Sequence, residues 1–210
     1  MTGILIAIEG NDGAGKTSLC SKLVDYFNKG EIQARNIKFN MSEVTLDAIK
    51  KGKEKKYSPA LNHYLHLSSL IDQVDTYASE ELQKGSIVVC DRYAYTLIAR
   101  GLARGLNQTV LEKSVSILPK PDLTFLLDIS PERGLERRKL KENEPLTYWE
   151  AGVDITKNTK YEESFLTFQG DVRRNFLNYR NDPNFFVIDA DDSFETVFNN
   201  VISKVKDKLK

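Results

Sequence analysis

The stretch Gly10-Asn11-Asp12-Gly13-Ala14-Gly15-Lys16-Thr17 lies between an apolar run, residues 4–8, and a run with helical spacing of its apolar side chains, residues 18–27. It fits the template G-x-x-x-x-G-K-[ST], which requires that succession of strand, glycine-rich turn and helix. The glycines let successive backbone N–H groups turn inward at a helix N-terminus, where an anion binds. The stretch therefore predicts a phosphate-binding loop, in preference to a plain glycine turn before a helix.

Two side chains of this loop carry the expected chemistry. Lys16 is predicted to reach the β- and γ-phosphates of a nucleotide, and the Thr17 hydroxyl to ligate Mg²⁺. The other positions expected to bind nucleotide phosphates are Gly10, Asn11, Asp12, Gly13, Ala14, Gly15 and Ser18.

The length, charge balance and cysteine content of the chain restrict the class of protein to which it can belong. Its 210 residues suit one domain with a substantial core. Lysines and arginines balance aspartates and glutamates at 30 each, so no charge signal indicates a nucleic acid or a membrane partner. Only Cys20 and Cys90 are present, which argues against a disulfide framework; both are expected to be buried structural cysteines. No signal peptide or spanning segment is recognised, and we expect a cytoplasmic protein with a small-molecule partner.

Four further apolar runs, each followed by a helical pattern, predict more strands. They cover residues 32–39, 86–90, 122–128 and 184–189. Five strands that alternate with helices predict a doubly wound α/β sheet. Within it, a helix is expected over residues 42–54, and a long one from Ser58-Pro59 to about Gln83.

The third of these strands ends in Asp91-Arg92, at the edge of a parallel sheet where ligand groups collect. Asp91 is a candidate to hold a Mg²⁺-bound water, and Arg92 a candidate clamp on phosphate oxygens. The alternative is an ion pair at a helix start. The phosphate-binding loop favours the functional interpretation.

Two basic stretches carry alternatives. The lysines within residues 50–56 either attract phosphate or form a solvated face, and we favour the solvated face. The segment 133–158 has the composition of a mobile basic lid or of a charged surface helix, and we favour the lid, because phosphoryl transfer requires excluded water and added positive charge.

The ordered motifs resemble those of the thymidylate kinase family of nucleoside monophosphate kinases. They are the loop with Glu9, Asp91-Arg92-Tyr93, Ala103-Arg104-Gly105-Leu106, the stretches 121–128 and 131–137, and Ile188-Asp189-Ala190. The resemblance implies a P-loop NTPase fold of three layers around a five-stranded parallel sheet with a small helical lid. It also implies Mg²⁺-dependent transfer of the γ-phosphoryl group of ATP to dTMP, in a homodimer.

The resemblance also implies roles for single residues. Lys16 and the loop would hold the ATP phosphates, with Thr17 on the metal, and Asp12 would contact the 3′-hydroxyl of the acceptor sugar. Arg92 would bind the acceptor phosphate. Arg137 would pack near adenine and Ala190 would border it. Gly13 resembles the variants that take a catalytic cation from the lid, for which the candidates are Arg138, Lys139 and Lys141.

The departures from the family fall on the acceptor side. The chain reads Phe39-Asn40-Met41-Ser42-Glu43 where the family has an Arg-Glu-Pro signature. An ungapped alignment puts His66 at the position of the base-stacking phenylalanine and Leu70 at that of the thymine-reading arginine. Arg100 and Gly101 replace an aromatic residue and a glutamine. The expected acceptor contacts are Asp12, Phe39, His66, Arg92, Tyr93 and Arg100.

Several alternatives stay open at this point. His66 is either a packing residue or a ligand of the base, whereas His63 is expected at the surface and Trp149 in lid packing. The changed acceptor positions leave room for a kinase of another nucleoside monophosphate or of a deoxynucleoside. A nucleotide-binding protein without kinase activity is a third possibility, which the presence of Lys16, Thr17 and Arg92 disfavours.

Overall fold

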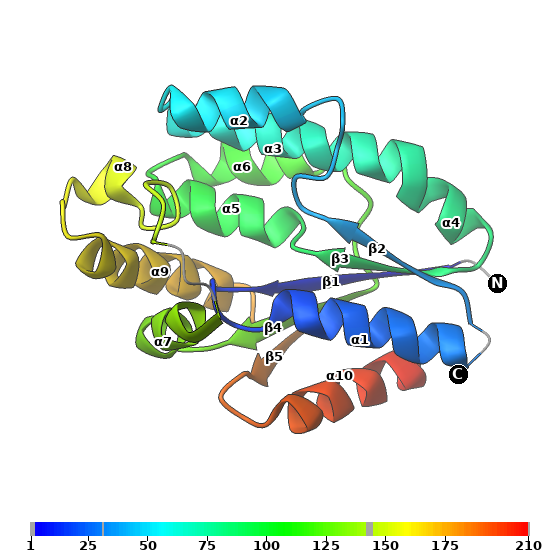
Figure 1. Ribbon diagram of the computed structural model, residues 1–210. Helices are drawn as coiled ribbons and strands as arrows, with labels where there is room; N and C mark the ends of the chain where they lie inside the picture. Colours follow the sequence, from blue (N-terminus) through cyan, green and yellow to red (C-terminus); the bar gives the residue numbers. More distant parts are fainter. Residues whose placement is uncertain (1–2, 31, 142–144, 210) are drawn as a thin grey trace.

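The computed structural model describes residues 3–30, 32–141 and 145–209, except the side chain of Lys141, and contains a five-stranded sheet. The strands lie in the order β2-β3-β1-β4-β5, and every neighbouring pair is parallel, so the predicted parallel α/β sheet is confirmed. Helices cover both faces, which makes three layers (Figure 1). The bounds are β1 (Ile4–Gly10), β2 (Ala34–Lys38), β3 (Ile87–Asp91), β4 (Leu123–Asp128) and β5 (Phe185–Asp189).

The helices follow the predicted starts in most places, and three that were not predicted are present: α6, α8 and α9. The predicted long helix is continuous but contains a π-helical stretch, η1, between α3 and α4. The bounds are α1 (Lys16–Lys29), α2 (Leu46–Glu54), α3 (Pro59–Gln73), η1 (Val74–Ala78), α4 (Ser79–Gln83), α5 (Ala94–Ala103), α6 (Gln108–Val115), α7 (Pro131–Lys141), α8 (Val153–Thr156), α9 (Tyr161–Leu177) and α10 (Phe194–Leu209).

Local sequence signals account for the helix ends. The Ser58 hydroxyl accepts a hydrogen bond from the Leu61 N–H at 3.3 Å, so it is the N-cap of α3. Ser193 caps α10 in the same way through the Thr196 N–H at 3.1 Å. After α4, Gly85 takes a left-handed φ of 85°, which ends the helix and lets the chain enter β3.

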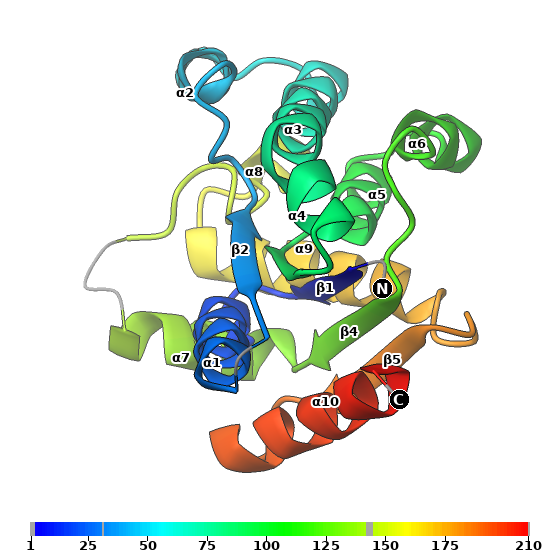
Figure 2. The same cartoon turned by 90° about the vertical axis from the view of Figure 1, so that its right-hand side faces the viewer.

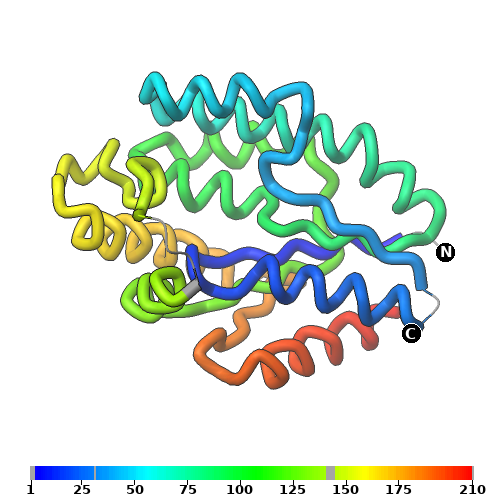
Figure 3. Tube along the Cα trace, viewed as in Figure 1, coloured from blue at the N-terminus to red at the C-terminus, as the bar shows by residue number. Residues whose placement is uncertain are grey.

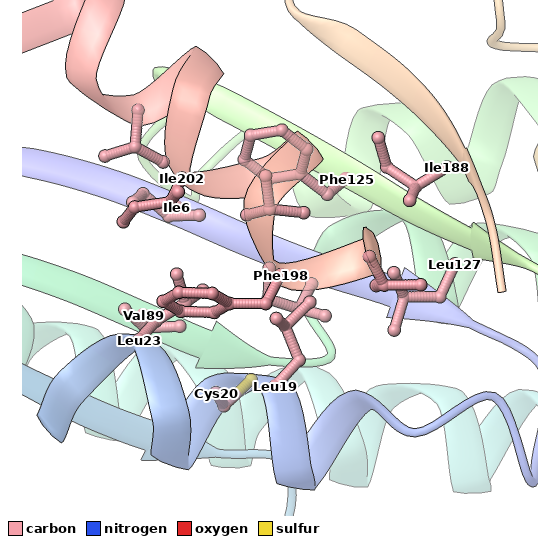
Figure 4. Close-up of a cluster of buried hydrophobic side chains, with 14 of the residues drawn as sticks. Ile6, Leu19, Cys20, Leu23, Val89, Phe125, Leu127, Ile188, Phe198 and Ile202 are labelled. Carbon is pink, nitrogen blue, oxygen red and sulfur yellow. The ribbon is translucent and has the colours of Figure 1, made fainter. Parts of the chain in front are cut away.

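The strands bury both of their faces, because side chains alternate along them. Ile6 and Ile8 of β1 face α1 and α10, in the cluster drawn in Figure 4 with Leu19, Leu23, Phe198 and Ile202. Leu5 and Ala7 face the opposite layer, which contains α3 and α5. Cys20 and Cys90 are both buried and unpaired, as predicted.

Because the sheet is all parallel, the carboxyl ends of its strands share one edge, on the left of Figure 1, where the turn from β1 to α1 lies. The tube in Figure 3 shows residues 145–160, which precede α9, at this same end of the molecule. The perpendicular view in Figure 2 shows α1 and α10 on one face of the sheet, with α3 and α5 on the other. No helix in the described ranges is both long and apolar enough to cross a membrane.

Candidate functional site

The loop between β1 and α1 depends on glycine at three positions. Gly10, Gly13 and Gly15 have φ values of 142°, 86° and 91°, which other residues rarely adopt. At Gly13 an added Cβ would also lie 2.2 Å from the carbonyl oxygen of Gly134, so the loop packs directly on the first turn of α7. The backbone N–H groups at the start of α1 are thereby left to face an anion.

Lys16 lies inside this loop, with only 6% of its surface exposed. Its Nζ donates to the carbonyl oxygen of Asn11 at 2.6 Å. Burial, followed by the nearby charge of Arg92, lowers the pKa of Lys16 to about 7. A buried ammonium held beside a loop of N–H groups is arranged to meet a phosphate.

Thr17 and Asp91 are in direct contact, as the carboxyl end of β3 lies beside the start of α1. The Thr17 hydroxyl donates to Asp91 Oδ2 at 2.6 Å. Mg²⁺ prefers oxygen ligands and typically takes one or two from the protein, with phosphates and waters completing its shell. This pair of oxygens therefore fits a magnesium–nucleotide site.

Asp12 is the centre of a charged cluster at the mouth of the loop. Arg92 donates to its Oδ1, and Arg100 Nη2 lies 3.0 Å from both carboxylate oxygens. Gln169 Nε2 donates to Oδ2 at 3.0 Å, while its Oε1 accepts from the Asp12 N–H at 3.4 Å. Burial alone would raise the pKa of Asp12, but the charges of Arg100, Arg92 and Lys16 outweigh it and hold the carboxyl well below its usual range.

The carboxylate of Glu9 stabilises, through hydrogen bonds, the turn in which Arg92 lies. This buried carboxylate accepts from the N–H groups of Tyr93 and Thr96, at 3.1 and 3.2 Å, and from the Thr96 hydroxyl. These bonds cap the start of α5 from the neighbouring strand and support the left-handed φ of 72° at Arg92. Burial raises the pKa of Glu9.

The motif match included Glu9 but assigned it no role, and it did not include Gln169. A signal for Glu9 was available, since it is the one charged residue within β1, whose other six residues are apolar or glycine. Gln169 follows from no loop motif. It reaches Asp12 only because α9 packs against α5 and α7.

A cavity of about 540 Å³ opens over the loop. The predicted residues Asp12, Lys16, Thr17, Asp91 and Arg92 all line it. Cationic side chains outnumber carboxylates on its walls, which suits a polyanion. The cations are Lys16, Lys38, Lys53, Arg92, Arg100, Arg137 and Arg138; the carboxylates are Asp12, Asp91 and Glu150.

A smaller cavity of about 120 Å³ adjoins the other side of the loop. Ala14 and Gly15 line it together with Arg137 and Ala190, and Arg137 Nη1 donates to the Ala190 carbonyl oxygen at 2.7 Å. The structure thus brings together two residues 53 positions apart that were both predicted at the adenine end. Of the remaining predicted loop residues, Ser18 lines the larger cavity. Gly10 and Asn11 line neither cavity: Gly10 packs against the Leu127 carbonyl group, and Asn11 Nδ2 donates to the Gln169 carbonyl oxygen at 3.0 Å.

A third cavity, of about 410 Å³, lies between α2, α3, α5 and the segment 147–150; we call it the acceptor cavity. Phe39, His66 and Arg100, three of the residues expected to contact the acceptor, line it. His66 stacks on Phe39 with ring centroids 5.0 Å apart, and its Nδ1 lies 2.5 Å from Asn40 Oδ1. Burial, reinforced by neighbouring cations, lowers the pKa of His66 to about 3, so the ring is neutral.

Three residues differ from expectation. Tyr93, predicted as an acceptor contact, lines none of the three cavities; it is buried in the apolar core, and its hydroxyl donates to the Pro119 carbonyl oxygen at 3.0 Å. His63 is buried rather than on the surface, with Nε2 2.9 Å from Ser114 Oγ, and it lines the acceptor cavity. Leu70 is a core residue, so its place in the ungapped alignment does not face a ligand.

Residues 147–150 form one wall of the acceptor cavity. Arg104 and Asp154 form a buried ion pair at 2.8 Å, and Arg104 lies between the rings of Trp149 and Phe168. Trp149 lines the cavity as well as packing, and its Nε1 donates to the Lys53 carbonyl oxygen at 3.0 Å. These contacts join residues 149–154 to α2 and to the C-cap residue of α5.

Among the proposed lid cations, Arg138 lines the phosphate cavity and pairs with Glu150 at 3.0 Å. Lys139 pairs instead with Glu162 at 2.7 Å and does not line that cavity. The side chain of Lys141 lies outside the described residues.

The comparisons with known proteins agree with this geometry. A family model described as "Thymidylate kinase" matches residues 8–201. "Probable thymidylate kinase 2" of Saccharolobus solfataricus is 34% identical over 90% of this chain and 89% of its own length. "Thymidylate kinase" of Idiomarina loihiensis is 31% identical over the full length of both chains. With the loop, the Asp-Arg turn and the two adjoining cavities in place, the chain belongs to the thymidylate kinase family.

Proposed function

We propose that the protein transfers the γ-phosphoryl group of ATP to dTMP, which gives ADP and dTDP. The observation that carries the proposal is that the phosphate cavity and the acceptor cavity share five lining residues: Phe39, Asn40, Lys53, Arg100 and Glu150. Two substrates bound in these cavities can therefore bring their phosphates together. The family match and the relatives named thymidylate kinase support the same reaction.

Phosphoryl transfer depends on positioning and charge rather than on a nucleophilic side chain. In the proposed mechanism the loop N–H groups and Lys16 hold the β- and γ-phosphates of ATP. Arg137 and Ala190 border the adenine. Arg92 binds the acceptor phosphate and aligns one of its oxygens for attack on the γ-phosphorus. That oxygen is already anionic at neutral pH, so no general base is required.

The negative charge that develops on the transferred group needs further cations. We propose Arg138 for this role, because it lines the phosphate cavity from α7. Thr17 and Asp91 would hold Mg²⁺, directly or through water. When bound there, Mg²⁺ neutralises charge on the β- and γ-phosphate oxygens. Closure of the segment 133–158 as a lid would exclude water from the reacting groups.

On the acceptor side, Asp12 is proposed to accept a hydrogen bond from the sugar 3′-hydroxyl, with His66 and Phe39 beside the base. Asp12 is engaged by Arg92, Arg100 and Gln169 in this structure. Acceptor binding therefore requires the arginines to share or exchange this carboxylate. A phosphate dianion is a suitable exchange partner for a guanidinium.

Because Leu70 lies in the core, the ungapped alignment does not locate a base-reading arginine, and one alternative stays open, a kinase with a different acceptor base. The deciding experiment is a coupled ADP-release assay with ATP and Mg²⁺ against dTMP, dUMP, dCMP, dGMP, AMP and free thymidine. We expect dTMP to have the highest kcat/KM. Preference for another monophosphate, or turnover of thymidine alone, would overturn the assignment of the acceptor; ATP binding without any turnover would overturn the proposed activity.

We further propose a homodimer in the cytoplasm. The homodimer is supported by exposed apolar side chains on α3 and α6, namely Leu61, Tyr64 and Val110. A reducing compartment suits the two unpaired cysteines. Light scattering after size exclusion tests the dimer, and a monomer at assay concentrations would contradict it.

A further inference from the structure

The cations at the boundary between the phosphate cavity and the acceptor cavity are Lys53 and Arg100. A monophosphate with its nucleoside in the acceptor cavity must place its phosphate at this boundary to meet a γ-phosphoryl group above the loop. Whatever cation lies there contributes to acceptor binding. This step rests on the proposed function, since it takes the acceptor to be a nucleoside monophosphate.

Arg100 already has a partner, because its Nη2 lies 3.0 Å from both oxygens of Asp12. Lys53 differs: within the described ranges its Nζ makes neither a hydrogen bond nor an ion pair. Burial, followed by the charge of Arg100, lowers the pKa of Lys53. An anion bound between Lys53 and Arg100 would offset both the burial of the ammonium and its repulsion by the guanidinium.

Close packing at the neighbouring residue, Gly52, holds this turn of α2, and with it Lys53, at the boundary of the two cavities. A Cβ at Gly52 would lie 3.1 Å from the Tyr57 ring and 3.2 Å from a Leu65 methyl group, so the glycine lets α2 pack closely over the start of α3. The other exposed lysines of this stretch, such as Lys51, line neither cavity. The run of lysines is therefore not uniform, since one member faces the two cavities.

Lys53 is also linked to the segment 147–150. Its carbonyl oxygen accepts the Trp149 Nε1–H at 3.0 Å, and Trp149 lines the acceptor cavity. This link uses the main chain of Lys53 and leaves its ammonium available. A phosphate held by the side chain would thus be bound next to the point where the segment 147–150 contacts α2.

We propose that Lys53 binds the phosphate of the acceptor nucleotide, together with Arg100, at the boundary of the two cavities. It is a binding residue from α2, outside the phosphate-binding loop and the Asp-Arg turn. Its ammonium acts as a point charge on a flexible stem. It therefore follows the acceptor phosphate rather than fixing its orientation.

The test compares Lys53→Met with the matched control Lys51→Met, and measures kcat and both KM values along with calorimetric binding of dTMP and thymidine. We expect Lys53→Met to raise the Kd and the KM for dTMP about tenfold. The KM for ATP and the Kd for thymidine, which lacks the phosphate, should stay within about twofold. Lys53→Arg should restore most of the dTMP affinity, and Lys51→Met should behave as wild type.

Unchanged dTMP affinity in Lys53→Met would overturn the proposal. Equal weakening of dTMP and thymidine would also overturn it, because the lysine would then act on closure or on the nucleoside. A rise in the KM for ATP alone would assign Lys53 to the donor. Failure of the wild-type protein to phosphorylate dTMP would instead overturn the proposed function, so the two failures are distinguishable.

Discussion

The phosphate cavity and the acceptor cavity share a boundary but are built differently. The phosphate cavity takes its backbone donors from one stretch, residues 10–18, held between β1 and α1. The acceptor cavity takes its walls from α2, α3, α5 and the segment 147–150, which are far apart in the sequence. The first is preorganised by a single turn whose glycines adopt left-handed φ values, whereas the second depends on contacts between separate elements.

Because of this difference, substitutions in the two cavities should affect catalysis, stability and acceptor affinity differently. Removal of one group from the loop should abolish catalysis and leave the fold intact. Removal of a contact that joins the walls of the acceptor cavity should affect stability and acceptor affinity together. The following variants test the contrast.

The largest effect is expected from Lys16→Ala. The ammonium is buried in the phosphate-binding loop, where we propose that it holds the ATP phosphates, and its loss should lower kcat by about 10²–10³-fold or more. Steady-state kinetics measure this, with thermal melting to show that the fold is retained. Near-wild-type turnover in a folded variant would refute the role of the loop.

On the acceptor side, Asp154→Asn breaks the buried pair with Arg104 and leaves that guanidinium without its charge partner. Breaking a buried pair costs about 3–5 kcal/mol in the free energy of unfolding. Urea denaturation measures the loss, and hydrogen exchange should locate it in residues 145–157. The control is Lys160→Gln, which removes an exposed pair with Glu163 and should leave the denaturation midpoint unchanged. Equal effects in both variants would show that Asp154 does not secure the segment.

An intermediate effect is expected from Gln169→Leu, at the contact between α9 and the loop. The leucine keeps most of the volume but removes both hydrogen bonds to Asp12. We expect kcat/KM for dTMP to fall about tenfold, since Asp12 loses its positioning. Gln108→Leu, at an exposed glutamine of α6, is the control. Kinetics equal to those of the control would remove Gln169 from the site.

The smallest expected effect is the uptake of a proton by Lys16 when ATP binds. With a pKa of about 7, Lys16 is largely neutral at pH 8 in the free protein, and bound phosphates favour its charged form. ATP binding should therefore take up about 0.9 proton at pH 8 and about 0.1 at pH 6. Calorimetry in buffers of different ionisation enthalpy measures the uptake. Proton release, or no change between these pH values, would contradict the lowered pKa.

Much of the phosphate side could be predicted from local sequence. The loop, the strand before it and the helix after it are contiguous, so one template describes their backbone. Arg92 was predicted because strand ends of a parallel sheet share an edge, and it does line the phosphate cavity. The family resemblance predicted Arg137 and Ala190 at the same end of the site, and the structure joins them by a hydrogen bond.

The errors arose where side-chain direction decides the outcome. Tyr93 follows Arg92 directly, yet the left-handed turn sends the arginine to the cavity and the tyrosine into the core. Helix α9 was not predicted, although Phe165, Phe168, Val172 and Phe176 have helical spacing and are buried. Without that helix, Gln169 could not be connected to Asp12.

The sequence by itself determined the parallel α/β sheet, the phosphate-binding loop and membership of a kinase family, because those features depend on short-range spacing of glycines and apolar residues. Tertiary structure alone decided that Lys53 faces two cavities, that His63 is buried, and that Glu9 caps a helix from another strand. These are properties of side chains from separate elements. They arise only when packing sets which face of each helix or strand turns inward.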